Sequence, residues 1–178
     1  MANTKPAANR NASDRKEDAR VGYQVAVSLW TYEGEQNWAR FNVMLVANSI
    51  IIAVLGLAAT SQLSNQGSLG PLSVVLSVVG LLLSAAWFLI TVRGFDYQKY
   101  YIVSAREMEQ YLQETVKTAS RGKLFADGQP VDIKIGEQTE RVQMSWLSRR
   151  ASAARLAKVV IVLFAILYIL ALIQVLLN

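Results

Sequence analysis

The sequence contains no cysteine and no histidine among its 178 residues. Without cysteine there is no disulfide framework, no thiol nucleophile and no thiolate metal site. Without histidine the chain lacks the commonest general base and the commonest transition-metal ligand. These two absences exclude Ser/His/Asp and Cys/His catalytic sets. No Walker loop is present either, so the sequence gives no reason to expect an enzyme, a cofactor or a metal.

Charge is missing from three long apolar runs, residues 41–60, 71–92 and 159–177. A helix needs about 20 mostly apolar residues to cross the hydrocarbon core of a bilayer. A charged side chain at the centre of such a helix costs about 2.5–3.5 kcal/mol on insertion scales. The pattern therefore predicts an all-α membrane protein with three transmembrane helices.

The rest of the chain divides around these spans. We expect a disordered tail over residues 1–20, an approach helix leading into the first span over 21–60, and a short external loop over 61–70. The second span follows at 71–92, a cytoplasmic helical hairpin at 93–158 and the third span at 159–178. No apolar segment with a cleavage site precedes residue 41, so the first span is expected to be an uncleaved anchor.

Lysine and arginine are distributed unequally about the spans. Six lie between residues 5 and 40, twelve between 93 and 158, and none between 61 and 70. The positive-inside rule then places the N-terminus and residues 93–158 in the cytoplasm and the C-terminus outside. Residues 93–158 also hold eight acidic side chains, which argues against nucleic acid as a partner. Basic residues beside the spans are expected to contact lipid headgroups: Arg40, Arg149, Arg150, Arg155 and Lys158.

Small residues form a stripe on each of the first two spans, at spacings of four, three and four. At 3.6 residues per turn such a set shares one helix face, which lets two helices approach closely. We expect the two spans to pack as an antiparallel hairpin along these stripes: Ser49, Ala53, Gly56 and Thr60 on the first, and Ser73, Ser77, Gly80 and Ser84 on the second.

Uncharged polar residues also occur at or within the spans. Asn42 lies at the expected interface, and Asn48 and Gln174 lie deeper. Such residues usually hydrogen-bond between helices, at about 0.6–2 kcal/mol, and less often line a pore. Both interpretations, a contact between helices or subunits and a pore lining, remain open for Asn42, Asn48 and Gln174.

The cytoplasmic segment is expected to be mainly helical. Apolar residues at helical spacing extend the second span to about residue 119, and residues 137–158 lead into the third span without Gly or Pro. Long helices would thus form a stalk, with a loop over residues 120–138. The turn signal at Ala126–Pro130 favours a small β-hairpin or an ordered loop there. Arg106 and Glu109, three residues apart, suit an ion pair on a solvated helix face.

The stretch from Tyr32 to Leu57, with the second span and the helix after it, resembles small bacterial inner-membrane proteins of unassigned function. The positions that carry this resemblance are Glu33, Trp38, Arg40, Asn42, Asn48, Arg106 and Glu107. A weaker similarity is to two-span effector modules of bacterial defence systems, which implies breaching of the membrane on a trigger. This chain differs from those modules in its third span.

Two functions are compatible with these features. The first is a non-enzymatic membrane protein that self-associates into a homo-oligomer, including a pore or channel-like effector. The second is a scaffold subunit that anchors a cytoplasmic or membrane partner through residues 93–158. The direction in which Asn48 and Gln174 point distinguishes them, because a pore requires these polar groups to face a shared aqueous axis.

Overall fold

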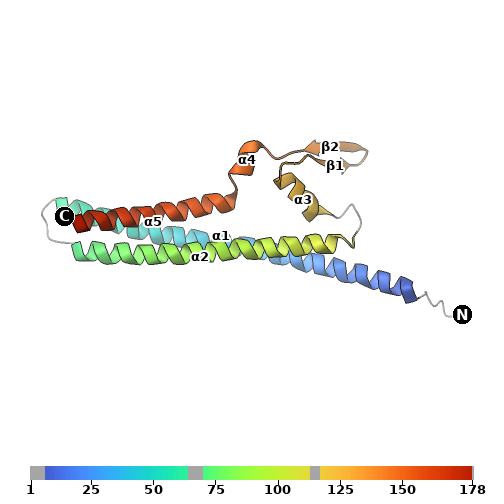
Figure 1. Ribbon diagram of the computed structural model, residues 1–178, viewed down its shortest axis with the longest axis horizontal. Helices are drawn as coiled ribbons and strands as arrows, with labels where there is room; N and C mark the ends of the chain where they lie inside the picture. The colour runs from blue at the N-terminus through green and yellow to red at the C-terminus, as the bar shows by residue number, and fades with distance from the viewer. Residues whose placement is uncertain (1–6, 64–69, 113–116, 178) are drawn as a thin grey trace. The chain divides into compact units, whose positions relative to one another are not determined.

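The computed structural model describes residues 7–63, 70–112 and 117–177 of the chain (Figure 1). It contains five helices and two strands within those residues. The chain divides into two compact units, each considered by itself below. The first comprises Met1–Gly34 and Asp96–Ser152, and the second comprises Glu35–Phe95 and Ala153–Asn178.

The second unit is built from parts of three helices: α1 (Ala7–Leu63), α2 (Gly70–Glu109) and α5 (Ala153–Leu177). Figure 1 shows α5 lying alongside these parts of α1 and α2. Each of the three helices is long and apolar enough to cross a membrane. The predicted all-α fold with three candidate spans is confirmed.

The core of the second unit follows one face of α2. Buried residues recur there at intervals of four and three, which keeps them on one side of the helix: Ser73, Ser77, Gly80, Ser84, Trp87 and Thr91. The Trp87 side chain is completely buried. Its ring lies 5.0 Å from Phe41 of α1 and 5.9 Å from Phe164 of α5, centroid to centroid. All three helices therefore meet along this face.

Gly80 is required by the closeness of that packing. A Cβ atom at this position would overlap the aromatic ring of Tyr168 on α5. Tyr168 is itself fully buried, because the missing side chain of Gly80 leaves room for its ring. The small residue thus accommodates an aromatic side chain from the third span.

The first unit packs the N-terminal part of α1 against the end of α2 and the short helix α3 (Thr118–Ala126). Its core is a set of buried alanines, Ala26, Ala105 and Ala119, bordered by Tyr23, Val27 and Ile102. The unit also contains the antiparallel hairpin of β1 (Val131–Ile135) and β2 (Gln138–Val142), followed by α4 (Trp146–Arg150). Small alanine side chains allow the helices to approach closely.

The helix limits differ from those expected. The structure has helix from Ala7, where a disordered tail to residue 20 was predicted, and residues 1–6 lie outside the described part. Helix α2 ends at Glu109, ten residues earlier than the apolar spacing predicted, and a turn follows at residues 110–112. The expected external loop is covered only in part, because residues 64–69 are not described.

The hairpin is present, but its turn is not where the sequence placed it. Ala126–Pro130 connects α3 to β1, and the strands turn instead at Gly136 and Glu137. Gly136 has a φ of 64°, a value that glycine adopts without steric cost. Residues 138–142 are therefore a strand where a helix was predicted, since their backbone groups pair with those of β1 rather than with one another.

Candidate functional site

Asn48 is the centre of a polar cluster that joins all three spans. Its side chain is completely buried. Nδ2 donates to the Met44 carbonyl at 2.8 Å, and Oδ1 accepts from Ser84 Oγ at 3.3 Å and from the Tyr168 hydroxyl at 3.0 Å. The Tyr168 hydroxyl also lies 3.2 Å from the Asn48 carbonyl oxygen. Residues from α1, α2 and α5 thus hydrogen-bond within one chain.

This arrangement uses the amide oxygen of Asn48 and one of its two N–H donors inside the subunit. An amide oxygen accepts two hydrogen bonds, and both are made here. Sequence reasoning found Asn48 as a polar residue between helices, but it gave no indication of Tyr168. That tyrosine lies 120 residues further along the chain, in the third span.

The two small-residue stripes have different surroundings. Ser73, Ser77, Gly80 and Ser84 of α2 are all buried within the chain. Ser49, Ala53, Gly56 and Thr60 of α1 are all exposed, and the residues of α1 that turn inward are Asn48, Leu55 and Ala58. The expectation that both stripes seal one hairpin is corrected for α1, because its opposite face contacts α2 and α5.

The remaining polar residues of the spans face outward in the single chain. Asn42 and Gln174 are both exposed. Hydroxyl groups on the exposed stripe bond to their own helix: Ser49 Oγ donates to the Leu45 carbonyl at 2.7 Å and Thr60 Oγ1 to the Leu57 carbonyl at 2.8 Å. Such local bonds reduce the cost of placing a hydroxyl against lipid.

The basic residues expected at headgroups lie on the surface. Arg40, Arg149, Arg150 and Arg155 are exposed, and Lys158 is half-buried. The Arg150 guanidinium lies 4.5 Å from the centre of the Trp146 ring on α4. This cation–π contact keeps an aromatic and a cationic side chain together on an exposed helix.

Glu109 organises the first unit in a way the sequence did not reveal. Instead of lying on a solvated face, its side chain is 1% exposed. One carboxylate oxygen accepts from the Ala119 amide at 2.6 Å and the other from the Ser120 amide at 2.8 Å. Lys117, at the N-cap of α3, makes no capping bond of its own, so Glu109 caps this helix from a distant position.

Two neighbours of Glu109 complete this connection. Arg106 Nε donates to the Ala119 carbonyl at 3.1 Å, so both residues hold the first turn of α3 rather than each other. Burial raises the pKa of Tyr23, and the nearby negative charge of Glu109 raises it further. Tyr23 therefore stays neutral and able to donate a hydrogen bond throughout the physiological range.

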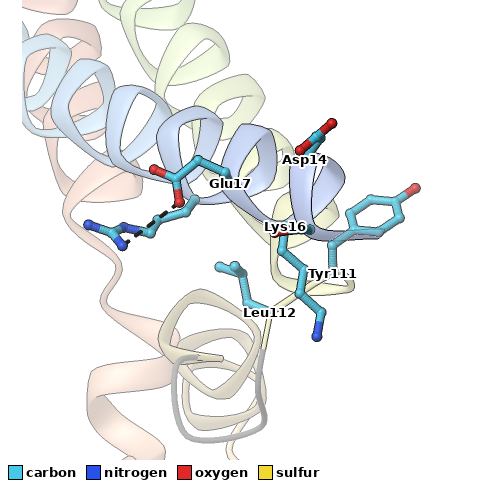
Figure 2. A pocket seen from close by; sticks show the side chains of 7 residues that line it. Asp14, Lys16, Glu17, Tyr111 and Leu112 are labelled. Atoms are coloured by element: carbon cyan, nitrogen blue, oxygen red, sulfur yellow. Dashed lines mark ion pairs between the residues drawn. The ribbon is translucent and has the colours of Figure 1, made fainter. Parts of the chain in front are cut away.

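The first unit also has a charged cleft of about 700 Å³ beside the N-terminal part of α1. Figure 2 shows Asp14, Lys16, Glu17, Tyr111 and Leu112 around it. Glu17 pairs with Arg20 at 3.9 Å, and both side chains are two-thirds exposed. Because acidic and basic side chains both line this open cleft, its charge does not favour an anionic or a cationic ligand. Within the described residues, no group of three or more acidic side chains is placed to hold a metal ion.

Three apolar helices joined by buried hydrogen bonds define a polytopic helical membrane protein. Comparison with protein families makes the assignment more specific. Residues 22–177 match the model of the octameric membrane protein family (8xMP), and the chain belongs to this family. The match supports the resemblance to small membrane proteins and the expected homo-oligomer. No curated protein and no solved structure showed a significant match.

Proposed function

We propose that this protein is a non-enzymatic scaffold of the bacterial inner membrane, in which a homo-oligomer holds the segment 93–158 on the cytoplasmic side for a protein partner. The spans supply assembly and anchoring, and the first unit supplies the surface for the partner. The distribution of lysine and arginine supports this orientation, since all 18 lie outside the stretch 41–92 and outside 159–178.

The observation that carries this proposal is that polar side chains of the spans hydrogen-bond to one another within a single chain. A hydrophilic pore needs polar side chains on its axis. Asn48, the deepest amide in the first span, instead bonds Ser84 and Tyr168 of its own chain. The hydroxyl-bearing face of α2 is buried in the same core. These side chains hold one subunit together and are not available to an aqueous passage.

Partner binding is supported by apolar side chains exposed in the first unit. Val103, Leu124 and Ile135 are 49%, 48% and 61% exposed, although they lie in a segment that is otherwise strongly charged. Exposed apolar side chains beside charged ones are characteristic of interaction surfaces.

A pore or channel-like effector is the second candidate, and one observation favours it. Asn42 and Gln174 are exposed on the spans of the single chain, where contact with lipid alone would be unfavourable. In a ring of copies both residues could face a common axis. The resemblance to membrane effector modules of defence systems is consistent with this function.

One preparation tests both candidates. The protein is purified in nanodiscs, its native mass is measured, co-purifying chains are identified, and conductance is recorded after transfer to a planar bilayer. A partner at fixed stoichiometry, retained without conductance, supports the scaffold. The scaffold proposal would be overturned by conductance that Asn42→Leu and Gln174→Leu abolish and that Asn48→Leu leaves unchanged. This result would establish the pore. An oligomer with neither partner nor conductance also contradicts the scaffold.

A further inference from the structure

An apolar groove lies between α3 and the β-hairpin of the first unit. It has a volume of about 390 Å³, and the cationic Arg121 of α3 lines it together with four apolar side chains, Phe125, Val131, Ile133 and Val142. Val131 is 8% exposed at the inner end of the groove, while Ile133 is 41% exposed at its mouth. A two-stranded hairpin is marginally stable by itself, so an uncovered apolar face on it favours a further contact.

The strand register places a negative charge beside this groove. Ile133 pairs directly with Glu140, and Val131 with Val142, so these four side chains share one face of the hairpin. Glu137 lies in the turn that follows β1. On the opposite face Asp132 is already paired with Arg141 at 2.8 Å, and this partner lowers the pKa of Asp132. Negative charge therefore lies on the hairpin side of the groove, while Arg121 supplies a positive charge on the α3 side.

Helix α4 carries a surface complementary to the groove. Trp146 and Leu147 are consecutive, exposed and apolar. Arg149 and Arg150 follow after Ser148, and the Arg150 guanidinium stacks on the Trp146 ring. An aromatic anchor beside an aliphatic one, surrounded by cationic groups, matches an apolar groove beside Glu137 and Glu140.

The structure fixes α4 relative to the turn between α3 and β1. Gln143 Nε2 donates to the Gly128 carbonyl at 2.7 Å. Gly128 has a φ of 78°, which favours glycine, and the Arg149 side chain lies close against it. Groove and α4 are thus parts of one compact unit, with α4 exposed rather than seated in its own groove.

We propose that the groove between α3 and the hairpin binds the Trp146–Leu147 pair of a second copy of this chain. A ring of more than two identical subunits needs a head-to-tail interface, in which each copy presents two different surfaces. The chain belongs to a family of octameric proteins. The groove and α4 are two such surfaces in one unit. This inference depends on homo-oligomerisation and is independent of the scaffold role.

The absence of cysteine makes a direct test available. Full-length Ile133→Cys with one affinity tag and Leu147→Cys with another are co-expressed, and the membranes are oxidised. Both positions are exposed, so neither change disturbs the core. We expect a disulfide-linked pair carrying both tags. The matched control replaces Ile133→Cys with Lys134→Cys, which points to the other face of the hairpin and should give several-fold less product.

Two results would overturn the proposal. One is an oligomer of unchanged native mass in which the mixed pair forms no more disulfide than the Lys134→Cys control. The other is strong quenching of Trp146 fluorescence by brominated lipids, measured as the difference between the wild type and Trp146→Phe. That quenching would place α4 in the bilayer interface. Loss of a co-purifying partner would affect the scaffold proposal but leave the disulfide result intact.

Discussion

At the scale of single residues, the core of the spans contains two buried serines, of which one has a hydrogen-bond partner and the other has none among the described residues. Ser84 and Ser77 lie on the same face of α2 and are both buried. Ser84 donates to Asn48, whereas Ser77 Oγ has no hydrogen-bond partner among the described residues. The pair therefore separates the contribution of a hydrogen bond from that of burying a hydroxyl.

We expect Ser84→Ala to lower the free energy of unfolding by roughly 0.6–1.7 kcal/mol, the range measured for hydrogen bonds between membrane helices. Ser77→Ala should leave stability unchanged or raise it slightly, because a buried hydroxyl without a partner is unfavourable. Thermal unfolding of both variants in the same detergent measures this difference. Equal losses in the two variants would show that the bond to Asn48 is not the cause.

Two glycines of the spans give a second comparison. Gly80→Ala should destabilise the fold by about 1–3 kcal/mol, because the added methyl group overlaps the Tyr168 ring and the core must shift. In Gly56→Ala, the control, the added methyl group has no neighbour within 4 Å in the single chain. Unfolding by denaturant in mixed micelles compares the two. A large effect of Gly56→Ala on native mass, with monomer stability unchanged, would instead locate a contact between subunits at that stripe.

At the scale of elements, α3 depends on a residue of another helix. We expect Glu109→Ala to leave the buried amide of Ala119 and the part-buried amide of Ser120 without acceptors, which costs about 1–3 kcal/mol. Hydrogen exchange should then accelerate over residues 118–126 while the spans remain protected. Glu107→Ala, an exposed neighbour on α2, is the control and should leave this exchange unchanged. Unchanged exchange in Glu109→Ala would contradict the capping role.

The spans were predictable because a charged side chain in the hydrocarbon core of a bilayer is costly, and this cost explains why 19 or more consecutive residues lack charge. The contacts between them were not. Spacing shows which residues share a face, but it does not show which face meets a third helix. Ser49 and Asn48 differ by one position, a rotation of about 100°. Asn48 turns inward because Tyr168 supplies a donor, and that pairing crosses 120 residues of sequence.

The hairpin illustrates a different limit. Alternation in residues 131–135 indicated a strand after the predicted turn, whereas residues 138–142 carry too many long polar side chains to be distinguished from a helix by pattern. Their strand conformation comes from pairing with β1. Glu109 was placed on a solvated face for a similar reason. Its burial depends on α3, which returns to it ten residues later.

At the scale of the whole molecule, the distribution of basic residues predicts a definite orientation. An impermeant thiol reagent applied to intact cells should label Ser68→Cys, in the predicted external loop outside the described residues. It should label Lys134→Cys only after permeabilisation. Because the natural chain has no cysteine, the purified protein can be labelled only at the introduced position. The reverse pattern would invert the orientation and exclude a cytoplasmic partner for residues 93–158.

The hydrogen bonds of Asn48 also bear on how the chain is made. Its partner Tyr168 emerges from the ribosome 120 residues later, which is roughly 6–24 s at typical rates of synthesis. During that interval Asn48 and Ser84 are in the bilayer without the last helix, and Gly80 leaves an unfilled space. A nascent chain stalled before its third span should therefore be recognised by membrane quality control, so that completion of synthesis and stability against proteolysis become linked.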